Sequence, residues 1–294
     1  MDAQTVSTTD VAEDTANPPQ HTATLSRFLL KACHVRGVLI EAAPLIREAN
    51  RIHGLEGIPA TLFGQVLMAS MSLLSISKGG VRQVLQLDAT RMTAPIVRMQ
   101  AETRPGMVRG YLNWNQDAQL RQGDDALLSS WMGSPVLTST VRDLGFSSPY
   151  ISTIEHASDF IADHIVHYLH QSTQIRADLA LSGHRALLIE AMPDCSDELW
   201  MQALTAMAAI DNTMLAEAGR ENILKMLESA DCQMLGEDSY NYQCMCNADS
   251  IMASLQSFSQ DQLHELADEH GEITLSCQYC RKNYITKVSG GHQS

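Results

Sequence analysis

The chain has 294 residues and a formal net charge of −14, from 20 Lys and Arg against 34 Asp and Glu. This length predicts about two domains with a substantial hydrophobic core. The negative charge argues against a nucleic-acid binder, because Lys and Arg supply the affinity for phosphate backbones. We expect no bilayer-spanning segment, which needs about 20 apolar residues, and the polar start lacks the features of a signal peptide. The sequence therefore predicts a cytosolic protein with no membrane partner.

The acidic residues are concentrated at the two ends of the chain. Residues 1–24 carry four acids and no Lys or Arg, include the stretch NPPQ and show no apolar periodicity. These features predict a disordered acidic tail over residues 1–24. Residues 231–294 carry nine acids and three bases, a net charge of −6, and residues 289–294 are expected to form a flexible end. The middle of the chain is therefore close to neutral.

Residues 25–193 alternate between strand and helix patterns. Pro44 suits the first turn of a helix that Gly54 ends. The strongest helix pattern covers residues 59–78, with apolar residues on most sides, which predicts a buried helix. Runs rich in β-branched and aliphatic residues, separated by turn signals, predict strands over 34–42, 81–89, 94–102, 106–114, 134–142, 149–156, 174–182 and 184–193. We therefore predict an α+β domain over residues 25–193, with a mostly antiparallel sheet.

A further helix is expected from Asp159 to about Gln171, with Ser158 as its N-cap. Histidines cluster in and before this helix, at positions His156, His164, His167 and His170. The spacing His164-x-x-His167 can bind metal, but both residues lie away from the apolar stripe of the helix. A solvated polar face is the better interpretation.

Residues 194–236 have a helical pattern of their own, which predicts a helical connector. Trp200, Leu204 and Met207 form one apolar stripe, and Gly219 interrupts the helical run. Six of the 15 methionines lie within residues 192–234. Met fills irregular gaps in a core, but it also makes adaptable apolar surfaces for varied partners, and both interpretations remain open.

Four cysteines near the C-terminus have the spacing of metal ligands. Cys244 and Cys246 form C-x-C, and Cys277 and Cys280 form C-x-x-C after two predicted short helices. Ser259 is expected to cap the second helix with Gln262, and strands are expected on either side of the C-x-x-C turn. Two pairs of thiolates can supply the four ligands of a tetrahedral Zn²⁺ ion, which would fold so small a unit. We therefore predict a zinc-binding module over residues 237–288.

These cysteines could also serve a different chemistry. A thioredoxin-type C-x-x-C needs a following helix, whereas the residues after Cys280 favour a strand. An iron–sulfur site also accepts four cysteines, and the thiols could be unligated. A nucleic-acid-binding zinc ribbon is disfavoured by the net charge of the region, although Arg281 and Lys282 lie at the turn.

A zinc site of this kind most often has a purely structural role. Four thiolates on one Zn²⁺ carry a formal charge of −2, however, and exposed thiolates react with oxidants. A cysteine in a disulfide is no longer a ligand, so oxidation would release the metal together with the folding energy that it supplies. The spacing therefore permits a redox switch.

The two cysteine motifs, about 30 residues apart, resemble those of the 33 kDa chaperonin family, the redox-regulated bacterial heat-shock chaperones. The resemblance extends to VRG at Val35–Gly37 and again at Val108–Gly110, to LFGQVLMASMSLLS, and to CQYC followed by NY. It covers about residues 25–288. Arg36 and Arg109 in the two VRG motifs are interpreted as structural strand-edge residues.

The resemblance implies an ATP-independent holdase, not an enzyme, with residues 25–193 as its chaperone domain. It implies Zn²⁺ on Cys244, Cys246, Cys277 and Cys280 in the inactive, reduced form. Oxidation would form Cys244–Cys246 and Cys277–Cys280 disulfides, release zinc, unfold the connector and yield a homodimer that binds unfolding proteins. Cys33, Cys195 and Cys232 are interpreted as bystanders. The alternative function is a zinc-containing thiol–disulfide oxidoreductase.

Overall fold

The structure, a computed structural model, describes residues 21–115 and 127–287. The end predicted over residues 289–294, and all but the last four residues of the tail predicted over 1–24, lie outside these ranges. The described chain divides into two compact units, which we call the large unit, up to Tyr242, and the small unit, from Gln243 onward. Each unit is described by itself below.

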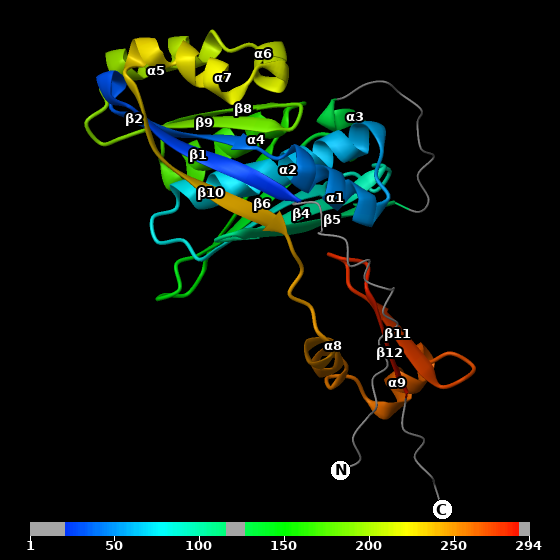
Figure 1. Ribbon diagram of the computed structural model, residues 1–294. Helices are drawn as coiled ribbons and strands as arrows, with labels where there is room; N and C mark the ends of the chain where they lie inside the picture. The colour runs from blue at the N-terminus through cyan, green and yellow to red at the C-terminus, as the bar shows by residue number, and fades with distance from the viewer. Residues whose placement is uncertain (1–20, 116–126, 288–294) are drawn as a thin grey trace, which may run out of the picture. The chain divides into compact units, whose positions relative to one another are not determined.

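One curved ten-stranded sheet organises the large unit (Figure 1). Its strand order is β7-β6-β3-β4-β5-β10-β1-β2-β9-β8, and its pairs are antiparallel apart from a short parallel contact between β10 and β5. The α+β class with a mostly antiparallel sheet is thus confirmed. The strands are β1 (Thr22–Leu30), β2 (Val35–Glu41), β3 (Arg82–Ala89), β4 (Ile96–Arg104), β5 (Met107–Trp114), β6 (Val136–Asp143), β7 (Tyr150–His156), β8 (Ala177–Ser182), β9 (Arg185–Ala191) and β10 (Cys232–Tyr242).

Helices cover both faces of this sheet. On one face lie α1 (Ala43–His53), α2 (Gly57–Ile76), α3 (Leu128–Met132) and α4 (Ile161–Tyr168), which continues as the π-helical turn η2 (Leu169–Thr173). On the other face, over β8 and β9, lie three short helices (Figure 1). We call these three helices the helical layer; they are α5 (Asp197–Ala208), α6 (Asn212–Glu217) and α7 (Arg220–Met226). Two 3-10 turns, η1 (Lys31–Cys33) and η3 (Glu228–Ala230), contact α5.

Helix α2 is the centre of the main core. Fifteen of its 20 residues are buried, as its apolar character on all sides predicts. By length and composition alone α2 could cross a membrane. Its position explains the composition, because 78% of its most apolar window is buried against the sheet and neighbouring helices.

Strands β1, β2 and β9 are buried on both faces. Val38, Ile40 and Leu188 pack into the main core with α2, whereas Leu39 and Leu187 pack into a second core beneath the helical layer. Successive side chains of a strand point to opposite faces, so each strand contributes to both cores. The helical layer therefore covers an apolar sheet surface.

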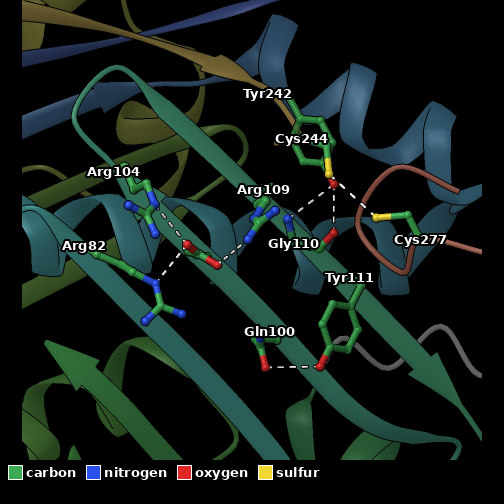
Figure 2. A network of polar contacts seen from close by, with 10 residues as sticks. Arg82, Gln100, Arg104, Arg109, Gly110, Tyr111, Tyr242, Cys244 and Cys277 are labelled. Carbon is green, nitrogen blue, oxygen red and sulfur yellow. Dashed lines mark hydrogen bonds and ion pairs between the residues drawn. The ribbon is translucent and has the colours of Figure 1, made fainter. Parts of the chain in front are cut away.

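Both VRG motifs place an arginine opposite a carboxylate on the neighbouring strand. Arg36 is paired in register with Glu190, and its Nε lies 2.6 Å from Glu190 Oε2. Arg109 is paired in register with Glu102, and its Nη2 lies 2.8 Å from Glu102 Oε2. Figure 2 shows Arg109 in this network together with Arg82 and Arg104. The two arginines thus have the structural role that was predicted.

Strands β1 and β10 were not predicted. Thr22, Ala23 and Thr24, which the sequence pattern placed in the tail, pair with β10 through Asn241, Tyr240 and Ser239. Among the residues of β10, Tyr240 alone is buried. A strand with most side chains exposed shows no alternation of apolar and polar residues, so its sequence carries little sign of its structure.

Two local predictions in the α4 region were wrong. The N-cap of α4 is Phe160 and not Ser158. The Ser158 hydroxyl nevertheless accepts a hydrogen bond from the Phe160 N–H. His164 does not lie on a solvated face but is fully buried. Its Nε2 lies 3.1 Å from the Ser158 carbonyl oxygen, and burial lowers the pKa of its imidazole. A polar partner therefore allows this histidine to lie in the core.

Candidate metal centre

The two cysteine pairs of the small unit come from different kinds of local structure. Cys244 and Cys246 lie in an extended stretch that leads into α8 (Ala248–Leu255). Asn247 caps this helix through a reciprocal capping box with Ser250. The following helix, α9 (Gln260–Leu266), has the capping box between Ser259 and Gln262 that the sequence predicts. The cap at Asn247 thus starts a helix directly after the C-x-C motif.

Cys277 and Cys280 lie in the turn of an antiparallel hairpin, as predicted. The hairpin consists of β11 (Glu272–Ser276) and β12 (Asn283–Lys287). The Cys277 N–H donates to the Lys282 carbonyl over 2.9 Å, and the Arg281 N–H donates to the Cys277 carbonyl over 2.8 Å. Arg281 has a φ of +61°, a left-handed conformation that tightens the turn. These backbone bonds close the turn that carries the two thiols.

The four sulfur atoms converge on one point. All four lie within 4.8 Å of one another, with 3.7 Å between Cys244 and Cys277 and 3.4 Å between Cys246 and Cys280 (Figure 2 shows the first pair). With Zn–S bonds of about 2.3 Å, the sulfurs of a tetrahedral site lie roughly 3.8 Å apart. Within residues 21–115 and 127–287, no other group of three or more His, Cys, Asp or Glu side chains is close enough to hold a metal ion. The cysteine cluster can therefore hold one.

Burial makes bare thiolates unfavourable in this cluster. It raises the pKa of the Cys246 thiol and, more strongly, that of the Cys280 thiol. Without a counter-charge, both groups would therefore keep their protons. A divalent cation removes this penalty, because it neutralises the thiolates that it binds. The donor set thus suits a metal that prefers sulfur ligands.

Tyr284 is a member of the site that sequence reasoning missed. Its hydroxyl donates a hydrogen bond to Cys246 Sγ over 3.1 Å, and its side chain is buried, with 4% of the residue exposed. The one sequence signal for this residue is the NY pair after the C-x-x-C motif. A cysteine ligand with a buried side-chain donor differs chemically from one without such a donor.

The other three cysteines lie in the second core of the large unit or against it. Cys33 and Cys195 are buried, and Cys232 is half-buried. Burial raises the pKa of all three thiols, to about 11 for Cys232, where Glu228 and Asp231 add to the effect. Protonated, buried thiols are poor nucleophiles, so these residues have the character of structural cysteines.

Comparison with known proteins gives a consistent result. The family described as "Hsp33 protein" matches residues 23–287. The 33 kDa chaperonin of Desulfotalea psychrophila is 25% identical over 276 residues, which cover 88% of this chain and 92% of that protein. The 33 kDa chaperonin of Geobacter sulfurreducens is 24% identical over 274 residues, with 88% and 90% covered.

The fold is also found in a solved structure. The crystal structure of the 33 kDa chaperonin (heat shock protein 33 homolog) from Thermotoga maritima superposes with a TM-score of 0.76. It covers 92% of this chain and 96% of that chain at 18% sequence identity. The family match over nearly the whole chain, the fold and the four clustered cysteines agree, and this chain belongs to the Hsp33 family.

Proposed function

We propose that this protein is an ATP-independent holdase whose client binding is controlled by the redox state of Cys244, Cys246, Cys277 and Cys280. Membership of a chaperonin family supports the chaperone role. The observation that carries the regulatory part is the convergence of four sulfurs within 4.8 Å in a unit with few other buried groups. In this proposal the protein is not an enzyme.

The reduced cysteines would bind one Zn²⁺ ion. Zn²⁺ at this point would neutralise the thiolates and cross-link the C-x-C stretch to the β11–β12 turn. The described part of the small unit buries only three apolar side chains besides Cys277, namely Leu255, Ile273 and Tyr284. So small a core supplies little hydrophobic stabilisation, and the cross-link would provide the rest.

Peroxide would oxidise the thiolates in two-electron steps. A thiolate attacks one peroxide oxygen, the O–O bond breaks, and a sulfenic acid and hydroxide form. A second thiolate then attacks the sulfenic sulfur, forms the disulfide and displaces hydroxide. We propose the pairs Cys244–Cys246 and Cys277–Cys280, so two peroxide molecules are consumed per chain. A disulfide sulfur is no longer a ligand, and the metal is lost.

Two short sulfur–sulfur distances in the structure, 3.7 Å and 3.4 Å, join other pairs than these. Cys244 lies close to Cys277, and Cys246 lies close to Cys280. A tetrahedral ligand set requires all four sulfurs to be neighbours, so the reduced geometry does not select the disulfides. The proposed pairs lie within one motif each, and residues two or three apart remain close when the module unfolds.

The helical layer is the proposed labile connector. Its helices have 12, 6 and 7 residues, too short to be stable without packing. They cover buried apolar residues of the sheet, among them Phe28, Leu39 and Ile189. Unfolding of this layer would expose an apolar surface for unfolding proteins and would accompany dimer formation.

We place this activity in the cytosol, because reducing conditions there keep the four thiols available as metal ligands. The net charge of −14 supports partners other than nucleic acid. The helix long enough to span a membrane is buried in the large unit, which supports a function without membrane insertion.

The decisive experiment compares metal content, free thiols and chaperone activity before and after peroxide treatment at elevated temperature. We expect one zinc per reduced chain, loss of that zinc and of four of the seven thiols on oxidation, and suppression of citrate synthase aggregation only afterwards. Dimer mass is measured alongside. Cys277→Ser should abolish tight zinc binding, whereas the control Cys195→Ser should retain it.

Two results would refute this function. One is a reduced, zinc-loaded protein that suppresses aggregation as well as the oxidised protein does. The other is catalytic turnover of a disulfide substrate such as insulin, which would favour a thiol–disulfide oxidoreductase. The strand β12 after Cys280 makes that outcome unexpected, because a thioredoxin-type motif is followed by a helix that lowers the thiol pKa.

A further inference from the structure

We propose that Tyr284 is a positioning residue that restrains the reaction of Cys246 with oxidants. The proposal rests on the redox function proposed above and concerns the sensitivity of the switch. The observation that carries it is the hydrogen bond of 3.1 Å from the Tyr284 hydroxyl to Cys246 Sγ.

The hairpin holds the Tyr284 hydroxyl in place. Tyr284 lies on β12 opposite Leu275 of β11, within five consecutive antiparallel pairs from Glu272–Lys287 to Ser276–Asn283. Its side chain is almost fully buried, as is that of Ile273 on β11. A ring fixed by both strand register and burial has little freedom, so its hydroxyl stays directed at the sulfur.

The hydrogen bond joins two chain segments that are distant in sequence. Cys246 belongs to the C-x-C stretch before α8, whereas Tyr284 lies 38 residues later on the strand that follows the C-x-x-C turn. Within the hairpin, backbone groups bind one another, as between Cys277 and Lys282. Tyr284 therefore adds a side-chain contact between the two halves of the ligand set.

A donor on a thiolate lowers its reactivity. The sulfur lone pair that would attack peroxide is partly engaged by the hydroxyl proton, and donors bind charged acceptors more strongly than neutral ones. Four thiolates with one divalent cation retain a formal charge of −2, so each donor also offsets excess charge. Removing the hydroxyl leaves the Cys246 sulfur more nucleophilic and less firmly oriented.

The step that Tyr284 restrains is the first attack on peroxide. The Cys246 thiolate forms a bond to one peroxide oxygen, the O–O bond breaks, and hydroxide leaves with the electron pair. Cys246 becomes a sulfenic acid, which a second thiolate converts to a disulfide as it displaces another hydroxide. Tyr284 supplies no electrons or protons to the products.

The test compares the full-length protein with Tyr284→Phe, which keeps the ring and removes the donor. The matched control is Tyr111→Phe in the large unit. Tyr111 is also buried, and its hydroxyl donates a hydrogen bond of 3.1 Å to Gln100 Oε1 (Figure 2), which the substitution removes. Three quantities are measured: the zinc affinity of the reduced protein, the rate of zinc release by peroxide, and the rate of alkylation of Cys246 by iodoacetamide. Mass spectrometry follows the alkylation.

We expect Tyr284→Phe to react about fivefold faster at Cys246, both with peroxide and with iodoacetamide, which is the effect of one hydrogen bond. Zinc affinity should fall about tenfold, and Tyr111→Phe should match the wild type in all three measurements. Site-specific 3-fluorotyrosine at position 284 keeps the hydroxyl and makes it a stronger donor, so it should slow both reactions.

Unchanged Cys246 rates in Tyr284→Phe, or equal rates for the fluorotyrosine protein and the wild type, would overturn the role of Tyr284. Failure of the proposed function looks different: the wild type itself would keep its zinc in peroxide or would gain no chaperone activity. Alkylation of Cys246 needs neither event, so it tests the Tyr284 contact in both cases.

Discussion

The ring of Phe28 lies directly across the backbone of Gly37, its register partner on the neighbouring strand. A Cβ atom at Gly37 would lie 2.3 Å from Phe28 Cζ and 2.7 Å from the Leu188 carbonyl oxygen. The glycine of the first VRG motif is therefore required by packing. Phe28 is fully buried in the core that the helical layer closes, so this contact supports the layer as well as the sheet.

Gly37→Ala should lower the free energy of unfolding of the large unit by about 1–3 kcal/mol, the usual cost of overpacking a core. The control is Gly219→Ala, where the nearest atom to a new Cβ would be 4.0 Å away. Denaturant unfolding of both variants checks the prediction. Equal stability of Gly37→Ala and the wild type would show that both Phe28 and the Leu188 backbone move aside without cost.

Glu102 should make the large unit less stable in acid. Its carboxylate is 2% exposed and is bound by Arg82, Arg104 and Arg109. Burial by itself raises the pKa of this carboxyl, but Arg109 and Arg82 outweigh that effect and hold the pKa at about 2 against an ordinary value of 4.5. Because the folded-state pKa is lowered, its stabilisation is complete above pH 4.5 and is lost as the pH falls towards 2. The full contribution is about 3 kcal/mol, of which about 2 kcal/mol should be gone by pH 3.

Denaturant unfolding of the wild type and of Glu102→Gln at a series of pH values tests this dependence. The difference in unfolding free energy should shrink as the pH falls from 6 to 3. Glu269→Gln, at a position with an exposed side chain, is the control. A difference that stays constant over this range would contradict a lowered pKa at Glu102.

Arg185 should hold the helical layer on the sheet. From β9, its Nη1 donates to the carbonyl oxygens of Leu215, Ala216 and Ala218 at the end of α6, and its Nη2 lies 3.1 Å from Glu41 Oε1. Carbonyls at a helix C-terminus lack partners within the helix, and a cation there is favourable. The guanidinium therefore binds a helix too short to be stable alone.

Arg185→Met should increase hydrogen exchange of the amides of α6 by about tenfold, as expected for a loss of roughly 1.4 kcal/mol in local stability. Arg47→Met, at an exposed position on α1, is the control. If the helical layer is the labile connector, the reduced variant should also suppress client aggregation in part. Unchanged exchange in α6 would mean that Arg185 does not hold the layer.

Removal of metal from the reduced protein should unfold the small unit and leave the large unit folded. Within residues 243–287 only a few side chains are buried, whereas the large unit has two apolar cores. Under anaerobic conditions with a strong chelator, amides of β11 and β12 should lose protection while those of β2 retain it. Hydrogen-exchange mass spectrometry measures both, and restored protection on adding zinc is the control. Retained protection in β11 and β12 would show that the hairpin folds without metal.

Features that depend on local patterns could be predicted from the amino-acid sequence. Three such features were predicted: the buried helix α2, the capping box of Ser259 and Gln262, and the hairpin around Cys277 and Cys280. Each of them depends on residues that are only a few positions apart. The spacing of the four cysteines also sufficed to indicate a ligand set, since few chemistries need two thiol pairs in so short a segment.

Features that depend on contacts between distant segments could not be predicted from local patterns. β10 became a strand because β1 pairs with nine of its residues, although its own side chains are mostly exposed. His164 lies in the core because the Ser158 carbonyl oxygen binds its imidazole. Tyr284 contacts Cys246 because the small unit folds and brings these two distant residues together. Long-range pairing and burial leave little trace in a local pattern, because the free energy that selects them comes from contacts between separate segments.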